Sequence, residues 1–276
     1  MSILLHGDCL EEMKGMDDDS VDLIFCDLPY GQTSCKWDCC IDLDKFWIEI
    51  MRIKKINTPI FMTTTTKFGA SLINSAPKKC PFRYDIVWVK SAPAGFLSAK
   101  KMPMRKHEMI YVFYEKLPFY DLSSHTHKFI KDPKNDKKVE PTLYGRMTKP
   151  RTRDKTYDPP LPVSIVKEEL DEKYKNKGGL YSNVSRNGLL KAEPHYDPPL
   201  PNSMLEIKST RGKHSTEKPV QLMEWVLKYY SKEGDLVLDP TMGSGSTGVA
   251  CKNMNRKFIG FELDKNIYET AKKRCE

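Results

Sequence analysis

Short apolar segments alternate with amphipathic segments at both ends of the chain. Runs of β-branched, aromatic and other apolar residues predict strands at 2–5, 21–26, 59–65, 84–89, 109–114, 235–238 and 258–261. Apolar residues spaced three and four apart predict helices at 9–14, 41–53, 67–74, 218–230, 246–253 and 265–274. Because strands alternate with helices, we expect an α/β fold with a doubly wound, mostly parallel sheet.

The alternating pattern is lost in the middle of the chain. Residues 118–210 are rich in Lys, Pro, Asn, Asp and Ser and contain few long apolar runs. The sequence Tyr-Asp-Pro-Pro-Leu-Pro occurs there twice, at 157–162 and 196–201. We therefore expect 1–117 and 211–276 to form one domain, with 118–210 as a loop-rich insertion.

Charge and cysteine content narrow the classes of protein. The chain has 276 residues and a formal net charge of +8, which favours a polyanionic partner. Its eight cysteines lack paired CxxC spacing with nearby histidines, so we expect reduced thiols and no metal site. The first residues turn polar too soon for a signal peptide, and no apolar run approaches the roughly 20 residues of a membrane span. We expect an intracellular protein.

A glycine-rich turn joins the predicted strand 235–238 to the predicted helix 246–253. Glycines there adopt backbone angles closed to other residues and let a ligand approach the main chain, as in nucleotide-cofactor sites. Glu262 ends the next predicted strand, about 20 residues on, where an acid can accept hydrogen bonds from ribose hydroxyls. The residues of the turn are Asp239, Pro240, Thr241, Met242, Gly243, Ser244 and Gly245.

Asp239 discriminates between the cofactors that such a turn could hold. It stands directly before the glycines, where its carboxylate would repel the pyrophosphate of a dinucleotide. A carboxylate at this place suits a cationic ligand, such as a sulfonium that also carries an α-amino group. The residues therefore predict S-adenosylmethionine as the cofactor.

A carboxylate and an aromatic ring follow the predicted strand 21–26. The exocyclic amine of a base is a poor nucleophile because its lone pair is delocalised into the ring. Asp27 can accept one of its two N–H groups, and the backbone carbonyl of Leu28 or Pro29 can accept the other, which localises the lone pair. Tyr30 offers a face on which a flipped base can stack. Much of the catalysis in such a site would be positioning.

These motifs resemble those of the amino-group DNA methyltransferases, which make N6-methyladenine or N4-methylcytosine. The segment 27–30 is similar to the family's Asp-Pro-Pro-Tyr, with Leu28 in place of the first proline, and 239–245 is similar to its cofactor motif. A catalytic motif that precedes the insertion and a cofactor motif that follows it resemble the permuted β group. The resemblance implies a Rossmann-like methyltransferase fold in which 118–210 is the target-recognition region.

The resemblance also implies cofactor contacts. The segment 213–219 is similar to the one that closes over the methionine part in the family, and 7–10 to the turn whose acid lies near the adenine. His214 and Thr216 have a structural role at a helix start as an equal alternative. Lys106-His107-Glu108 is a further family feature to which no role is assigned. The expected cofactor residues are Asp8, Cys9, Asp27, His214, Thr216, Lys218, Pro219, Asp239, Pro240, Thr241, Gly243, Ser244, Gly245, Glu262 and Leu263.

Asp27 implies the target base, because in this family an Asp at the first motif position accompanies adenine and a Ser accompanies cytosine. We therefore expect methylation of adenine N6 in double-stranded DNA, with the base flipped out of the helix. Basic residues near the expected site and in the insertion are candidates for phosphate contacts, with an ordinary solvated charge as the alternative for each. They are Lys100, Lys101, Arg105, Lys106, Arg146, Lys149, Arg151 and Arg153.

Three other functions stay open at this point. The chain could methylate cytosine N4, or it could act on an RNA base or a protein glutamine, whose families place the cofactor loop before the catalytic motif. It could also be a catalytically silent DNA-binding relative, although the intact Asp27, Tyr30, Asp239 and Glu262 argue against that. A second copy of the chain and a cognate restriction endonuclease are candidate partners. The expected location is the cytoplasm or another intracellular compartment that holds DNA.

Overall fold

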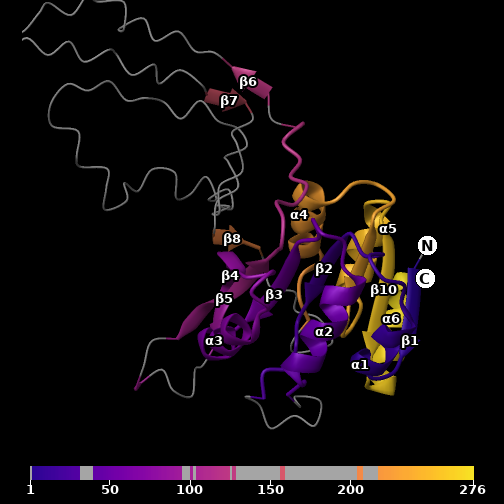
Figure 1. Ribbon diagram of the computed structural model, residues 1–276. Helices are drawn as coiled ribbons and strands as arrows, with labels where there is room; N and C mark the ends of the chain where they lie inside the picture. The colour runs from indigo at the N-terminus through magenta and orange to yellow at the C-terminus, as the bar shows by residue number, and fades with distance from the viewer. Residues whose placement is uncertain are drawn as a thin grey trace, which may run out of the picture.

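The computed structural model describes residues 2–31, 40–94, 100–101, 104–124, 126–128, 156–158, 204–207 and 217–276 (Figure 1). Its centre is an eight-stranded sheet, and a separate pair is formed by β6 (Thr126–Lys128) and β7 (Thr156–Asp158). In spatial order, the strands of the main sheet are β1 (Ser2–His6), β10 (Lys257–Glu262), β9 (Leu236–Asp239), β2 (Leu23–Cys26), β3 (Ile60–Thr64), β5 (Arg105–Phe113), β4 (Phe82–Ala94) and β8 (Met204–Glu206).

The strand directions confirm the predicted, mostly parallel sheet. β1, β10, β9, β2 and β3 are all parallel, and β8 is parallel to β4. β5 is antiparallel to both of its neighbours, β3 and β4. The five adjacent parallel strands therefore end at one side of the sheet, which we call the carboxyl edge, and β5 begins at that same edge.

Seven short helical segments accompany the sheet in the part of the chain that the structure describes. Most lie within one or two residues of the predicted ranges; α4, for example, begins at Val220 where 218 was predicted. Pro219 is its N-cap with an extended ψ of 136°. A proline also disfavours the helical conformation for the residue before it, so Lys218 stays outside the helix. The segments are α1 (Cys9–Glu12), η1 (Met13–Gly15), α2 (Leu43–Ile53), α3 (Thr66–Ser75), α4 (Val220–Tyr230), α5 (Ser246–Asn253) and α6 (Lys265–Cys275).

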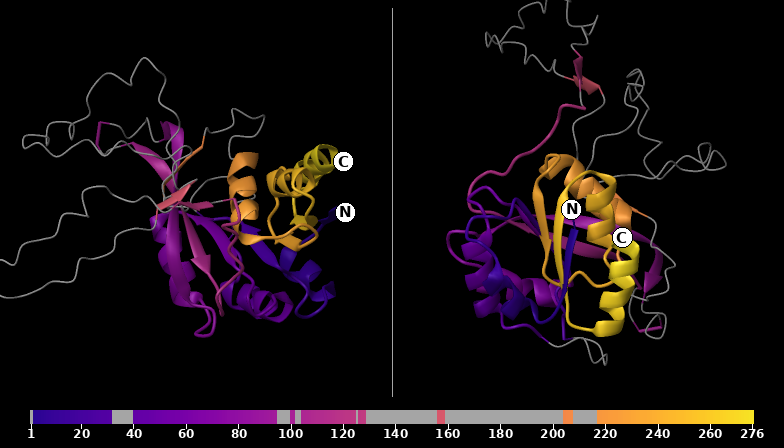
Figure 2. Two further views of the ribbon diagram at one scale, coloured as in Figure 1. Left: turned by 90° about the horizontal axis from the view of Figure 1, so that it is seen from above. Right: turned by 90° about the vertical axis from the view of Figure 1, so that its right-hand side faces the viewer.

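Helices cover both faces of the sheet, so the expected doubly wound arrangement is confirmed (Figure 2). Alternate residues of β2 point to opposite faces: Leu23 and Phe25 pack with residues of α4, α5 and α6, and Ile24 and Cys26 with residues of α1, α2 and α3. Each such fully buried apolar side chain contributes roughly 1.5–3 kcal/mol. Two buried cores therefore hold the carboxyl edge rigid.

The predicted insertion contributes to the main sheet. β8 lies within 118–210 and pairs with β4, so the end of this region extends the sheet. Because β5 is antiparallel to β3, the chain enters the insertion at the edge opposite the carboxyl edge, and it returns along β8 toward the carboxyl edge. Among the described residues, none of the helices has the length and apolar character needed to span a membrane.

Candidate active site

The carboxyl edge holds Asp27 between neighbouring strand ends. Asp27 follows β2, and because Cys26 pairs with Met62, the next residue of β3, Thr63, lies beside it. The hydroxyls of Tyr30 and Thr63 both donate hydrogen bonds to Asp27 Oδ1, that of Tyr30 at 2.8 Å. One carboxylate oxygen is therefore oriented by two hydroxyl groups.

The other oxygen of Asp27 accepts a charged donor. Lys218 Nζ lies 2.5 Å from Asp27 Oδ2 and 3.7 Å from Glu108 Oε2, and the lysine side chain is only 11% exposed. Burial alone would lower the pKa of Lys218, but the carboxylates of Asp27 and Glu108 outweigh it, so this pKa is raised above its ordinary value. Lys218 is an ammonium at neutral pH.

Glu108 extends this arrangement into a row of alternating charges. It pairs across the strands with Trp88, and its Oε1 accepts a hydrogen bond from Lys90 Nζ at 2.5 Å. Its Oε2 is buried without a hydrogen-bond partner. We call Lys90, Glu108, Lys218 and Asp27 the ion-pair row.

The segment 27–30 divides its side chains between the site and the core. Leu28 is buried with the residues of α1, α2 and α3, so only its backbone can contact a ligand. The ring of Tyr30 lies 5.3 Å from that of Phe68 at an interplanar angle of 35°, while its hydroxyl reaches Asp27. Pro29 stays partly exposed between them. The substitution of Leu for the family's proline is thereby accommodated by packing.

The glycine-rich turn is tied to the end of β10. Gly243 and Gly245 have φ of 53° and 83°, in the left-handed region that favours glycine. The amide of Gly243 donates to Glu262 Oε2 at 3.1 Å, and the amide of Asp264 donates to Glu262 Oε1 at 2.8 Å. Burial raises the pKa of Glu262, while these two amides favour its ionised form.

Asp239 lies buried beneath the turn. Its Oδ2 accepts a hydrogen bond from Thr247 Oγ1 at 2.6 Å, and its Oδ1 accepts one from the amide of Thr241 at 3.1 Å. Burial raises the pKa of Asp239 to about 7. The hydroxyl oxygens of Thr241 and Ser246 are buried beside it without a hydrogen-bond partner. Buried hydroxyls are normally bonded, so these two unpartnered atoms fit a polar ligand.

The ends of β1 and β10, which are neighbours in the sheet, complete the carboxyl edge. His6 pairs with Glu262, and Asp8 caps α1 by accepting from the amide of Leu10 at 2.8 Å. Leu263 follows Glu262 and is 66% exposed. Burial raises the pKa of the Cys9 thiol to about 12, so Cys9 is a neutral residue here.

The structure adds residues that local sequence patterns did not single out for the site: Thr63, Lys90, Thr247 and Arg274. Arg274 donates to Ser244 O at 2.8 Å and to Ser244 Oγ at 2.6 Å, and through its other nitrogen to Glu217 Oε1 at 2.7 Å. It thus links the glycine-rich turn to the residue before Lys218. The resemblance drew attention to Glu108 but assigned it no role.

The remaining predicted residues fall into two groups. Four basic residues lie exposed near the start of β5. Separately, no group of three His, Cys, Asp or Glu in the described part of the chain is arranged to hold a metal ion. The exposed residues are Lys100, Lys101, Arg105 and Lys106. The predictions at Arg146, Lys149, Arg151, Arg153, His214 and Thr216 lie outside the described residues.

Comparison with known proteins identifies the family. An α/β sheet with a glycine turn and a carboxylate at neighbouring strand ends defines a Rossmann-like class of protein. The sequence matches the N6/N4 DNA methylase family over residues 21–273, and the chain belongs to this family.

Three curated relatives illustrate the range of similarity. The type II methyltransferase M2.DpnII of Streptococcus pneumoniae is 44% identical over 71 residues, which are 26% of this chain and 26% of that protein. M.HinfI of Haemophilus influenzae is 24% identical over 99% of this chain and 68% of its own length. M1.MboII of Moraxella bovis is 25% identical over 95% of this chain and 92% of its own length. The more identical matches thus span about a quarter of each protein.

Solved structures show the same fold. M1.HpyAVI in its complex with SAM matches with a TM-score of 0.56 at 21% identity, over 100% of both chains. The cytosine-N4-specific PvuII DNA methyltransferase matches with a TM-score of 0.59 at 12% identity, over 99% of this chain and 86% of that one. The predicted α/β methyltransferase fold is therefore confirmed.

Proposed function

We propose that this chain transfers a methyl group from S-adenosylmethionine to the exocyclic N6 of adenine in double-stranded DNA. The observation that carries the proposal is the placement of Asp27. Its carboxylate, bonded by Tyr30, Thr63 and Lys218, lies at the same sheet edge as the glycine-rich turn and Glu262. A base acceptor and a nucleoside site therefore share one edge.

The residues of the edge fit S-adenosylmethionine. Glu262 would accept the ribose hydroxyls, and the exposed Leu263 would cover one face of the adenine. The unpartnered hydroxyls of Thr241 and Ser246 would bind the polar methionine part above Asp239. When bound, this cofactor supplies an electrophilic methyl group on a cationic sulfur. Asp8, Cys9, His214, Thr216, Lys218, Pro219, Pro240, Gly243, Ser244 and Gly245 would line the rest of the site.

Asp27 would activate the target amine. Its carboxylate accepts one N–H, and the carbonyl of Leu28 or Pro29 accepts the other, so the nitrogen lone pair points away from the base ring. Asp27 also lies where it can take up the proton that the nitrogen loses on gaining the methyl group. Tyr30 would stack on the flipped base, which is worth roughly 1–3 kcal/mol per base in single-strand complexes.

The choice of adenine rests on Asp27 at the first position of the motif. Cytosine N4 is the second candidate, since the PvuII enzyme of the same fold carries that specificity in its name. The order of catalytic motif, insertion and cofactor turn supports the permuted β group. It argues against the RNA-base and protein-glutamine enzymes, and the assembled row around Asp27 argues against a silent DNA-binding relative.

DNA would approach over the basic residues near the carboxyl edge, with the insertion as the target-recognition region. Lys100, Lys101, Arg105 and Lys106 would contact phosphates there, and Arg146, Lys149, Arg151 and Arg153 would do so from the insertion. We also propose an intracellular location, because the substrate is genomic DNA. A second copy of the chain and a cognate restriction endonuclease are the partners that this function suggests, as for type II systems.

Transfer of labelled methyl from S-adenosylmethionine to unmethylated DNA tests this function. We expect labelled N6-methyladenine, and loss of the label with Asp27→Ala. Asp44→Ala, at an exposed aspartate in the first turn of α2, is the matched control and should keep the label. N4-methylcytosine as the product would overturn the base assignment. Absence of label in DNA from a protein that binds the cofactor would overturn DNA as the substrate.

A further inference from the structure

Two carboxylates share one ammonium in the ion-pair row. Lys218 Nζ lies 2.5 Å from Asp27 Oδ2, within hydrogen-bond distance, and 3.7 Å from Glu108 Oε2, beyond it. The side chains of Lys218 and Glu108 are only 11% and 16% exposed. A buried carboxylate oxygen without a donor is costly, and Glu108 Oε2 is such an atom. The ammonium therefore has an unused second acceptor close by.

The proposed reaction requires Asp27 to accept a hydrogen bond from the target amine. Its Oδ1 already accepts from Tyr30 and Thr63, and its Oδ2 accepts from Lys218. A cation on Oδ2 competes with the base for that atom and withdraws charge from it. An oxygen of a carboxylate can accept two hydrogen bonds, but a neutral amine binds Oδ2 more strongly once the ammonium has left that atom.

Glu108 is placed to receive that ammonium. Lys90 binds its Oε1 at 2.5 Å and also lies 5.1 Å from the centroid of the Trp88 ring, so Glu108 is held from one side while Oε2 faces Lys218. A shift of Lys218 by about one ångström would replace one charge-assisted hydrogen bond with another. During this shift the Lys218 ammonium stays close to a carboxylate, so no charge of the ion-pair row is left buried without a partner.

We propose that Glu108 is a positioning residue that takes the Lys218 ammonium away from Asp27 when the target amino group binds. The inference rests on the proposed methyl transfer and deepens it. In the protein without DNA, Lys218 holds the place of the amine and keeps Asp27 oriented. On base entry, Glu108 and Lys90 stabilise the displaced ammonium, and Asp27 becomes available to the base.

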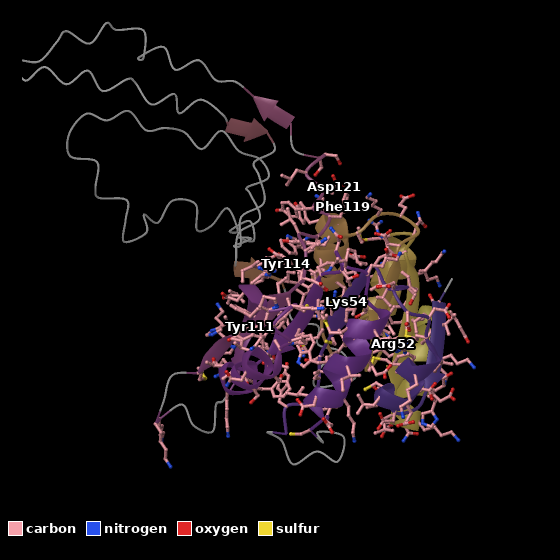
Figure 3. All side chains as sticks on the ribbon, in the orientation of Figure 1. Arg52, Lys54, Tyr111, Tyr114, Phe119 and Asp121 are labelled. Carbon is pink, nitrogen blue, oxygen red and sulfur yellow. The ribbon has the colours of Figure 1, made fainter. Side chains whose placement is uncertain are left out.

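Glu108→Gln tests the proposal, because it preserves the size of the side chain and removes its charge. A matched control is Glu115→Gln. Glu115 follows the end of β5 at the opposite edge of the sheet and accepts a hydrogen bond from Lys54 at 2.9 Å. Lys54 is buried and is labelled in Figure 3. Each change removes the carboxylate that pairs with a buried lysine, Lys218 or Lys54, but only Lys218 also contacts Asp27.

Two readouts separate a positioning role from a structural one. The first is the single-turnover rate of methyl transfer to DNA. The second is the ratio of affinities for duplexes that carry the target base or an abasic site, once the methylated sequence has been read from the wild-type product. With Glu108→Gln we expect the rate to fall about tenfold or more and the ratio to fall similarly, as for loss of one charge-assisted contact. The affinity for S-adenosylmethionine should stay at the wild-type value.

Glu108→Asp adds a second, conservative variant. It retains the charge on a shorter side chain, so its rate should lie between those of the wild type and Glu108→Gln. A wild-type rate and ratio in Glu108→Gln would overturn the proposal, as would a loss of cofactor affinity that matches the loss of rate. If the wild-type protein itself does not methylate DNA, the proposed function fails, and that result is distinct from either outcome for Glu108.

Discussion

At the scale of single residues, the carboxylates of the edge differ through their surroundings. Asp27 is paired with an ammonium and two hydroxyls, and Glu262 accepts two backbone amides. Asp239 accepts only neutral donors in a buried place, which raises its pKa to about 7. The charge of Asp239 therefore changes near physiological pH.

The raised pKa of Asp239 predicts pH-dependent cofactor binding. A cationic ligand binds the ionised carboxylate better, and the carboxylate is protonated below its pKa of about 7. The affinity for S-adenosylmethionine should therefore rise between about pH 6 and about pH 8 and then level off. Calorimetric titration at several pH values in this range measures the affinity for S-adenosylmethionine. Asp239→Asn is the reference: protonation of the ligand itself affects both proteins equally, so the difference between their pH profiles reports on Asp239. Parallel pH profiles for both proteins would contradict the prediction.

At the scale of elements, α5 and α6 hold the glycine-rich turn by close packing. A Cβ on Gly248 of α5 would lie 2.6 Å from Cys275 Sγ and 2.8 Å from the Phe258 ring. Glycine thus lets α5 approach both β10 and α6. Arg274 of α6 binds Ser244 in the turn, so α6 supports the glycine-rich turn directly.

Gly248→Ala should destabilise the fold. Alanine favours a helix over glycine by at most about 1 kcal/mol, but overlap with core atoms on two sides outweighs this gain. We expect the free energy of unfolding in urea to fall by about 1–3 kcal/mol. Gly15→Ala is the matched control, because a Cβ at Gly15 meets no atom within 4 Å, and it should change stability by less than about 0.5 kcal/mol. Equal stabilities of the two variants would refute this account of the packing.

Arg274→Met should weaken cofactor binding more than it weakens the fold. The methionine keeps apolar contacts but loses the hydrogen bonds to Ser244 and the ion pair with Glu217. We expect the dissociation constant for S-adenosylmethionine to rise about five- to tenfold, as for loss of a charged hydrogen bond. Lys273→Met, at an exposed neighbour on α6, serves as the control. An unchanged dissociation constant in Arg274→Met would show that the turn keeps its shape without this link.

At the scale of the whole molecule, the charge distribution points to one approach for DNA. The exposed basic residues 100–101 and 105–106 lie near the carboxyl edge, because β5 begins there. The chain enters the insertion at the opposite edge and returns along β8. The sheet thus presents the proposed ligand-binding residues and a basic surface on the same side.

Charge reversal at this surface should weaken DNA binding. Arg105→Glu is expected to lower the affinity for DNA and reduce its salt dependence by about one unit of the log–log slope per lost phosphate contact. Lys78→Glu, at an exposed lysine before β4 at the opposite edge, should leave the affinity at the wild-type value. Arg151→Glu with Arg153→Glu should act like Arg105→Glu while cofactor binding is retained. Equal affinities for Arg105→Glu and Lys78→Glu would contradict this placement of DNA.

The sequence by itself determined the parts of the protein that depend on local pattern. Strand and helix periodicity predicted the parallel sheet, and strand-end motifs predicted that Asp27, the glycine-rich turn and Glu262 would share one edge. These inferences succeed because parallel strands all end at the same side of a sheet. Hydrophobic alternation, turn chemistry and strand direction are thus sufficient for this level of description.

Only the tertiary structure decided how distant side chains meet. Lys218 is 191 residues from Asp27, and Glu108 reaches Lys218 because β5 runs antiparallel and begins at the carboxyl edge. Arg274 meets Ser244 and Glu217 only once α6 has packed against α5. Such contacts depend on strand order, strand direction and helix packing, which arise from burial of the two cores as a whole. They therefore cannot be predicted from the pattern of any short segment of the sequence.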